Sequence, residues 1–397
     1  MRICFLCTSG LDNASPRGRW LPIARELARR GHETHLTLLH PTYDRVRTRR
    51  FRVDGVNVAY VGQMHVYGDP GRRRYFGPLQ LVSVVLGGAA ALAAHALKVR
   101  PDVLHVAKPQ PANGIAALVA RGRSRLYVDC DDYEAEANRF GSPWQRRAVR
   151  WWEDRLPLLC RGVSVNTRFL QRRIAGQGVA PGRIVYVPNG ISAGRRRPAP
   201  GRHVHGLRSA LGLDGHPTVI YLGTMSTVAH GVGLLLEAFA HVARAMPEAR
   251  LLMVGDGDDR PTLRRKAEEL GVETAVVWTG NVPADSTGAY LALADCSVDP
   301  VYDTPAARAR SPLKIVESLA AGVPVVTGDV GDRRAMLANG AAGVLVSPGD
   351  AHALAEGIEI VLTQPALRAH LALAAVEQAS MYDWRRLVEQ WNTIYEV

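Results

Sequence analysis

The segment SPLKIVESLAAGVPVV (311–326) places a lysine in the first turn of an expected helix. Ser311 is a typical N-cap residue, and Pro312 suits the first helical position. Lys314 therefore falls where the helix dipole is positive and a cation is unfavourable. Two interpretations are open. Lys314 pairs with Glu317 on the surface at i,i+3, or Lys314 and the free amides at the helix start hold a diphosphate while Glu317 binds sugar hydroxyls.

Glycines follow three apolar segments of the second half of the chain. Glycine at such a place lets the backbone approach a ligand closely, although each pair could equally form a tight turn. The pattern contains no complete G-x-G-x-x-G dinucleotide fingerprint. We predict a ligand site where these segments end, at Gly223-Thr224 after TVIYL, Gly255-Asp256-Gly257 after LLMV, and Gly280-Asn281 after VVWT.

Two further groups in the first half could do chemistry. His105 and Lys108 lie at the end of the apolar segment DVLHVA. A histidine there is more often a core or hydrogen-bonded residue than a catalyst, but a neutral imidazole could accept a proton from a sugar hydroxyl. The segment VDCDDYEAEANRF carries Asp129-x-Asp131-Asp132. These carboxylates could hold a divalent metal, bind hydroxyl or amine groups of an acceptor, or cap the following helix.

Strand-like and helix-like segments alternate along almost the whole chain. The first half carries apolar strands such as ETHLTLLH and RLYVDC, and the second half begins a new alternation at TVIYLGT. This pattern predicts an α/β protein with two doubly wound, Rossmann-like parallel sheets facing across a cleft. The Gly-, Pro- and Arg-rich segment 191–206 is predicted to be a linker between domains 1–190 and 207–381. Paired aspartates such as Asp129 and Asp131 hold a divalent metal in single-domain transferases. A two-domain protein is predicted here, so we predict that no metal is bound.

One segment has the length of a membrane span. Residues 79–97 carry no charged side chain, and Arg72-Arg73-Arg74 precede them. The segment also contains two adjacent glycines and a histidine, so its hydrophobicity is modest. We interpret it as a buried domain helix that leads into DVLHVA. A helix in contact with the membrane surface and a true span remain the alternatives.

The charge is unevenly distributed along the 397 residues. Residues 1–200 contain 33 Lys and Arg against 14 Asp and Glu, a balance of +19, whereas residues 201–397 contain 16 against 23, a balance of −7. The first half could therefore meet an anionic acceptor or membrane surface, or simply be solvated. Nucleic acid is not expected, because aromatic residues are not interleaved with the arginines. Five scattered cysteines indicate reduced thiols, so a cytoplasmic location is expected.

The second half resembles the donor domain of glycosyltransferase family 4. The resemblance spans about residues 218–363 and follows YLGT, LLMVGDG, VVWTGNV, SPLKIVESLAAGVPVVTGD and GVLVSPGD in order. LARRGHETHLTL, PDVLHVAKP and VPNGI in the first half agree more weakly. The tail 382–397 resembles the family's terminal helix, which crosses back to the first domain. The resemblance implies a GT-B fold and a retaining, metal-independent transferase that uses a UDP- or GDP-linked sugar.

The resemblance also implies roles for individual residues. For the catalytic group we predict His105 and Glu317, which the resemblance implies, together with Lys108 and Lys314 from the sequence itself. For the donor-binding group the resemblance implies Gly10, Gly280, Asn281, Val282, Ser311, Pro312, Leu313 and Glu317, and the loops and cations of this sequence add Gly223, Thr224, His230, Asp256 and Arg310. For the acceptor we predict Arg17, Asn113, Asp131 and Asp132.

The sequence departs from the family pattern at two places. Ala309 stands eight positions before Glu317, where the family has a glutamate that contacts the sugar. The loop GTMSTVAHG contains Thr224 and His230 where the family commonly has an arginine and a lysine. The charge of the diphosphate must then be met by other cations. Those available are Lys314, Arg308, Arg310, Lys108 and Arg17.

The expected function is transfer of a sugar from a nucleotide-diphosphate sugar to a hydroxyl of a lipid-linked, polysaccharide or natural-product acceptor. No cofactor beyond the donor substrate is expected. Peripheral contact with the inner face of an anionic membrane is an additional expectation. The alternatives are a sugar phosphorylase or epimerase of the same fold, and a non-catalytic binder of nucleotide sugars. The departure at Ala309 motivates the last of these.

Overall fold

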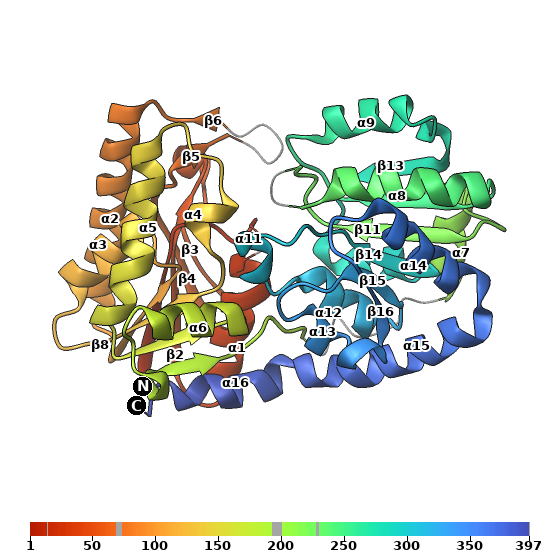
Figure 1. Cartoon of the computed structure of the whole chain (residues 1–397). Coiled ribbons are helices and arrows are strands. Elements are labelled where there is room, and N and C mark those ends of the chain that lie inside the picture. Colours follow the sequence, from red (N-terminus) through yellow and green to blue (C-terminus); the bar gives the residue numbers. More distant parts are fainter. Residues whose placement is uncertain (14, 69–73, 193–200, 228–229, 397) are drawn as a thin grey trace. The chain divides into compact units, whose positions relative to one another are not determined.

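The computed structural model describes residues 1–13, 15–68, 74–192, 201–227 and 230–396 (Figure 1). The chain divides into two compact units. Unit 1 contains Met1–Gly190 together with Trp384–Val397, and unit 2 contains Ile191–Asp383. Arg72, Arg73 and half of the predicted linker, residues 193–200, lie outside the described residues. Helix α7 (Gly201–Ala210) begins inside the range predicted as linker.

Unit 1 is built on an eight-stranded sheet in the order β10-β9-β8-β7-β1-β2-β4-β3. All neighbouring strands are parallel except β3 and β4, which form an antiparallel edge. The central strands are apolar on both faces, as expected of a parallel sheet covered by helices on both sides. The strands are β1 (Arg2–Cys7), β2 (Glu33–His40), β3 (Arg50–Val53), β4 (Val56–Gln63), β7 (Val103–Ala107), β8 (Arg125–Cys130), β9 (Gly162–Val165) and β10 (Ile184–Tyr186); a separate hairpin pairs β5 (Val66–Tyr67) with β6 (Arg74–Tyr75).

Helices cover the sheet of unit 1 in two layers (Figure 1). α1 packs beside α16, while α2 packs beside α3, and α3 beside α5. The helices are η1 (Pro16–Trp20), α1 (Leu21–Arg29), η2 (Tyr43–Arg45), α2 (Pro78–Val99), α3 (Pro111–Ala120), α4 (Glu134–Ala137), α5 (Pro143–Leu159), α6 (Arg168–Gly176), η3 (Pro181–Arg183) and α16 (Trp384–Thr393).

The last helix of the chain is part of the core of unit 1. Trp384, Leu387, Val388 and Trp391 of α16 are buried in the same apolar cluster as residues of β1 and α1. Each large apolar side chain buried in this way contributes about 1.5–3 kcal/mol. The chain therefore leaves unit 1 after Gly190 and returns to complete its core.

Helix α2 presents a different face on each side. One face packs on β2, β4 and α3, and His95 hydrogen-bonds the Thr37 hydroxyl at 2.9 Å. The opposite face exposes apolar side chains, among them Leu79 (89% exposed) and Leu86 (52%). By length and composition α2 could cross a membrane, and only 28% of its most apolar window is buried. The helix leads into β7 as expected, but the prediction that it is buried holds for one face only.

Unit 2 contains a six-stranded sheet in the order β13-β12-β11-β14-β15-β16, and all its pairs are parallel. The strands are β11 (Thr218–Leu222), β12 (Arg250–Val254), β13 (Val276–Gly280), β14 (Cys296–Asp299), β15 (Val325–Gly328) and β16 (Gly343–Val346). The helices besides α7 are α8 (Val232–Ala245), α9 (Arg260–Glu269), η5 (Glu273–Ala275), η6 (Ala284–Ser286), α10 (Thr287–Leu291), α11 (Pro305–Arg308), α12 (Leu313–Ala320), α13 (Arg333–Met336), η7 (Ala338–Gly340), α14 (Ala351–Thr363), α15 (Pro365–Ala379) and η8 (Ser380–Tyr382).

Helix α12 begins one residue later than expected. Pro312 is the N-cap, with an extended backbone at φ −73° and ψ 114°, and the first helical residue is Leu313. Lys314 is therefore the second helical residue and still lies in the first turn.

Candidate functional site

The glycine loops of unit 2 contact one another at the carboxyl ends of their strands. The Gly223 amide donates to the Val254 carbonyl at 2.9 Å, and the Gly255 amide donates to the Gly280 carbonyl at 3.0 Å. A Cβ atom on Gly255 would lie 2.0 Å from the Gly223 carbonyl oxygen. Loop-to-loop packing is thus one reason for glycine here. The expected approach of a ligand to these loops stays a prediction.

A buried carboxylate explains the position of Lys314. Asp299 ends β14, and its carboxylate lies 3.3 Å from the Lys314 ammonium and 2.8 Å from Nε of Arg333. The side chains of all three residues are less than 10% exposed. Burial alone would raise the pKa of Asp299, but Arg333 and Lys314 hold it well below its usual range. Lys314 also lies over the Tyr221 ring, at 4.2 Å from the centroid.

Positive charge is in excess around this carboxylate. Arg310 lies on the same side, with a guanidinium nitrogen 3.4 Å from Nδ1 of His230. Burial, Lys314 and Arg310 lower the pKa of His230 well below its ordinary value, so this imidazole is neutral near pH 7. Burial also lowers the pKa of Lys314; Asp299 opposes this shift, whereas Arg310 and Arg333 reinforce it. Lys314, Arg310 and Arg333 thus place three cations near the Asp299 carboxylate, which suits an anionic ligand.

The other predicted donor residues lie on loops and helix starts of unit 2. Ser311 and Pro312 are buried at the start of α12, while Leu313 and Glu317 are partly exposed. Asp256 accepts from the Gly257 amide at 2.8 Å and pairs with Arg260 at 3.3 Å. The remaining positions are placed as follows: Thr224 and Asn281 exposed, Val282 and His230 partly exposed, Gly280 buried, and Ala309 buried with no exposed surface.

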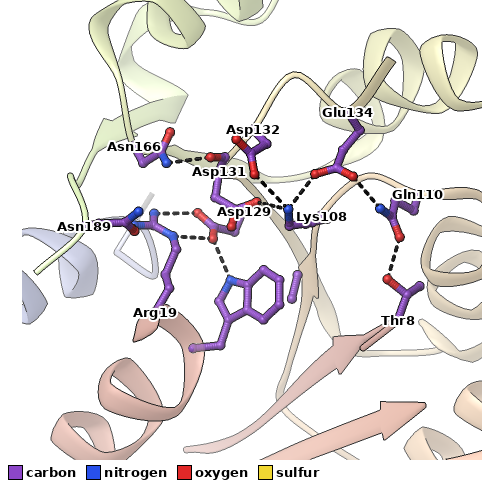
Figure 2. Close-up of polar contacts among 12 residues, drawn as sticks. Thr8, Arg19, Lys108, Gln110, Asp129, Asp131, Asp132, Glu134, Asn166 and Asn189 are labelled. Atoms are coloured by element: carbon purple, nitrogen blue, oxygen red, sulfur yellow. Dashed lines mark hydrogen bonds and ion pairs between the residues drawn. The ribbon is translucent and has the colours of Figure 1, made fainter. Parts of the chain in front are cut away.

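Lys108 is the centre of a second polar cluster, in unit 1 (Figure 2). Its ammonium lies 3.4 Å from Asp131, 3.1 Å from Asp132 and 2.5 Å from Glu134. Its backbone has φ 74°, a conformation that costs a non-glycine residue about 1–3 kcal/mol and often marks functional sites. Burial raises the pKa of Asp131 to about 8, although the nearby Lys108 opposes this shift. Three carboxylates so close together could hold a metal ion, but the lysine already contacts all three.

Further polar residues hold this cluster in place. The Thr8 hydroxyl donates to Gln110 at 2.5 Å, and Gln110 donates to Glu134 at 2.7 Å. Glu153 of α5 accepts the backbone amides of Glu134 at 2.6 Å and Ala135 at 3.1 Å. A buried side chain of α5 therefore holds the first residues of the short helix α4 in place.

Asp129 belongs to a separate, structural group. Its carboxylate accepts two hydrogen bonds from Arg19, at 2.7 and 2.8 Å, and one from the Trp20 indole at 2.7 Å. Arg19 also donates to Asn189 at 3.1 Å (Figure 2). The predicted acceptor residue Arg17, two positions earlier on η1, is exposed. The predicted donor residue Gly10 is buried, and its carbonyl accepts from the Asn13 amide at 3.0 Å.

Two predicted site residues, His105 and Asn113, are fully covered by the protein. His105 has no exposed surface; its Nδ1 hydrogen-bonds the Tyr395 hydroxyl at 3.0 Å, and its ring stacks on Trp391 of α16. Burial lowers its pKa to about 3. Asn113 also has no exposed surface, and its amide donates to the Ala107 carbonyl at 2.6 Å. The structure shows no surface of either side chain open to a sugar, and their roles stay predictions.

Sequence reasoning missed several members of both clusters. Asp299 and Arg333 surround Lys314, and Gln110, Glu134 and Thr8 surround Lys108. A usable signal existed for some of them. Thr8 directly follows β1, and Asp299 is the last residue of β14, so both lie at the edge where parallel-sheet proteins bind ligands.

Two doubly wound parallel sheets, each with a polar cluster at strand ends, define a class of two-domain α/β proteins. A family model described as "Glycosyl transferases group 1" matches residues 216–364. A model described as "Glycosyl transferase 4-like domain" matches residues 17–190. The chain belongs to this glycosyltransferase family, family 4, as the sequence resemblance predicted.

Named proteins agree with this assignment. The chain is 32% identical over 217 residues to a phosphatidyl-myo-inositol mannosyltransferase of Mycobacterium leprae, a match covering 53% of each protein. It is 29% identical over 233 residues to a GDP-mannose-dependent alpha-(1-6)-phosphatidylinositol monomannoside mannosyltransferase of Mycolicibacterium smegmatis, covering 58% and 59%. The chain thus spans little more than half the length of these curated relatives. A sucrose-phosphate synthase structure from Thermosynechococcus elongatus matches with a TM-score of 0.79 and 19% identity, covering 100% of this chain and 98% of that one. This likeness confirms the GT-B fold.

Proposed function

We propose that the protein is a retaining, metal-independent glycosyltransferase that moves a sugar from a nucleotide-diphosphate sugar to an acceptor hydroxyl. The observation that carries the proposal is the excess of positive charge around Asp299. Lys314 lies in the first turn of α12, where the backbone amides add positive potential, while Arg310 precedes this helix and Arg333 begins α13. The names of the mycobacterial relatives, one of which includes GDP-mannose, support a nucleotide-sugar donor.

In the proposed reaction, protein groups stabilise the departing diphosphate. The bond between the anomeric carbon and the phosphate oxygen breaks, and the acceptor oxygen forms a new bond to the same face of that carbon. The acceptor proton passes to an oxygen of the leaving phosphate. Fixed amide dipoles and the Lys314 ammonium stabilise the charge that grows on the leaving group. The ion pair with Asp299 fixes the lysine in place before the donor binds.

The acceptor is assigned to unit 1. Asp132 and Glu134 offer carboxylate oxygens that accept hydrogen bonds from sugar or polyol hydroxyls, Asp131 adds a carboxyl group, and Lys108 keeps the three groups close together. A lipid-linked acceptor is favoured because the names of both mycobacterial relatives include phosphatidylinositol. The strongly basic first half of the chain is compatible with an anionic lipid.

The same proposal includes peripheral contact with a membrane. The outward face of α2 carries exposed Leu79, Val82, Leu86 and Leu97. The other face of α2 packs on the sheet of unit 1. A helix packed in this way fits lying against a lipid surface better than crossing it.

The test of the donor site is Lys314→Met, which keeps the length of the side chain and its packing on Tyr221. We expect sugar transfer to fall by two decades or more, because the charge facing the leaving group is lost. Lys266→Ala, which removes a surface lysine paired with Glu237 in the same unit, is the control. Turnover of Lys314→Met within a factor of three of wild type would remove Lys314 from the mechanism.

One observation favours a second possibility, a non-catalytic binder of nucleotide sugars. Position 309 carries the methyl side chain of an alanine and is fully buried, so it offers no carboxylate to a sugar. Tight binding of a nucleotide sugar without transfer to any acceptor would support the binder. Sugar turnover that needs only the nucleotide sugar, or only orthophosphate, would instead indicate an epimerase or a phosphorylase.

A further inference from the structure

A hollow of about 640 Å³ lies in unit 1 at the start of α5, and we call it the arginine pocket. It is separate from the Lys108 cluster, although α4 contributes residues to both. Its lining combines three arginines with small polar groups and one phenylalanine: Ala135, Glu136, Asn138, Phe140, Gly141, Ser142, Pro143, Arg146, Arg147 and Arg150.

Cations outnumber carboxylates in the arginine pocket. Glu136 is the only acidic residue among its lining residues, and it pairs with both Arg146 and Arg150. Arg146 is oriented further by a hydrogen bond from Nε to the Ala135 carbonyl at 2.9 Å. Arg147 is exposed, and among the residues that the structure describes it has no carboxylate at ion-pair distance. The lining therefore has a net charge of +2.

The three arginines lie close together near the start of α5. α5 begins at Pro143 with Ser142 as N-cap, and Ser142 and Gln145 form a capping box. Arg146, Arg147 and Arg150 are its fourth, fifth and eighth residues, and Arg146 lies in the first turn, at the positive end of the helix dipole. An anion bound between the arginines would offset both their mutual repulsion and their unfavourable interaction with the helix dipole. The cluster at Lys314 has the same arrangement, since Asp299 is one carboxylate shared by two cations and a third cation adds a further charge.

We propose that the arginine pocket binds a phosphate ester. Guanidinium groups donate parallel N–H bonds that match the oxygens of a phosphate. The hollow exceeds the size of a bare ion, and Phe140 and Pro143 give it an apolar wall for the organic part of an ester. The ester comes either from the headgroup of an anionic lipid or from a free phosphorylated metabolite. The proposal that this pocket binds an ester does not depend on the proposed function.

The role of the ester rests on the proposed function. Glu134 of the Lys108 cluster and Glu136 of the arginine pocket are two residues apart on α4. A single acceptor molecule could thus place hydroxyls on one side of α4 and its phosphate on the other. Under this reading, the arginine pocket selects phosphorylated acceptors.

The test compares Arg147→Gln with Arg155→Gln in the full-length chain. Both changes remove one positive charge from an exposed position of α5, but Arg155 is not a lining residue. The probes are glycerol 3-phosphate, measured by titration calorimetry, and phosphatidylcholine vesicles with and without phosphatidic acid, measured by co-sedimentation. We expect Arg147→Gln to weaken binding of the ester about tenfold, as loss of a charged hydrogen bond would. Arg155→Gln should change it less than twofold.

Each outcome shows whether the arginine pocket binds a phosphate ester, and from which source. Selective weakening of vesicle binding by Arg147→Gln assigns the pocket to a lipid headgroup, and selective weakening for the soluble ester assigns it to a free metabolite. Equal effects of the two variants, or binding of neither probe to wild type, would overturn the proposal. Binding of GDP or UDP to Arg147→Gln should match wild type. A failure of the phosphate site and a failure of the proposed donor site are therefore distinguishable.

Discussion

Lys314 and Lys108 share one arrangement: each is held by carboxylates at the end of a neighbouring strand. Asp299 ends β14 and faces Lys314, while Asp131 directly follows β8 and faces Lys108. A lysine ammonium with little access to water is costly unless it is paired, and removal of one partner from a buried pair typically costs about 3–5 kcal/mol. The two clusters differ in charge. Cations are in excess around Asp299, whereas carboxylates are in excess around Lys108, which suits an anionic donor and a hydroxyl-bearing acceptor, respectively.

Glu153 makes the stability of unit 1 depend on pH. Burial and the charge of Glu134 raise its pKa to about 8, from a usual value of 4.5. The folded protein then keeps a proton that the unfolded chain releases above pH 4.5. Stability from this group is therefore lost as the pH rises from about 5 to 8, by up to about 1.4 kcal/mol per pH unit. We expect Glu153→Gln to flatten this slope in urea unfolding curves measured at pH 5, 6.5 and 8.

The Glu153→Gln experiment needs a control of the same chemistry. Glu389→Gln makes the identical change on α16 of the same unit, where the side chain is 73% exposed. Asp131, whose pKa burial also raises to about 8, adds to the wild-type slope in the same direction. Glu153→Gln should therefore reduce the slope without abolishing it. Identical slopes for wild type and Glu153→Gln would contradict the assigned protonation of Glu153.

At the scale of elements, α2 has one face that packs on the sheet and one face that is exposed. Its inner face is held by the sheet, since Gly88 packs on Leu39 so closely that a Cβ atom would lie 3.0 Å from a methyl carbon. Its outer face leaves apolar side chains exposed to water. Covering this face with lipid would gain about 25 cal/mol for each Å² of apolar surface removed from water. The fold does not need these side chains for its core.

The double variant Leu79→Ser/Leu86→Ser should weaken binding to vesicles that contain anionic lipid by fivefold or more. Both side chains are more than half exposed, so unfolding should be little changed. Leu373→Ser on α15 of unit 2 is a control with 76% exposure. Co-sedimentation measures the binding. If the double variant binds as wild type does, α2 does not contact the membrane.

At the scale of the whole molecule, the sequence predicts the fold class better than it predicts the tertiary contacts between side chains. Alternating apolar segments and the order of family-like motifs were sufficient to predict the fold class. Tertiary partners were not predictable, because Asp299 and Lys314 are 15 residues apart and meet only when β14 and α12 pack together. His105 shows the same limit. Its position at a strand end indicated a site, but the rings that cover it, Trp391 and Tyr395, come from the far end of the chain.

The division into two units gives a prediction about where a nucleotide binds. Unit 2 contains the start of α12 and the Asp299 cluster, so we expect GDP or UDP to slow hydrogen exchange there. At one hundred times its Kd, a ligand that binds only the folded state stabilises it by about 2.7 kcal/mol, enough to reduce exchange through unfolding about a hundredfold. Peptides that contain residues 299 and 310–317 should be protected, and those of α2 and α5 in unit 1 should not. Lys314→Met should lose the protection at the same nucleotide concentration, whereas Lys266→Ala should keep it. Protection confined to unit 1, or protection that is equal in Lys314→Met and wild type, would place the nucleotide away from α12.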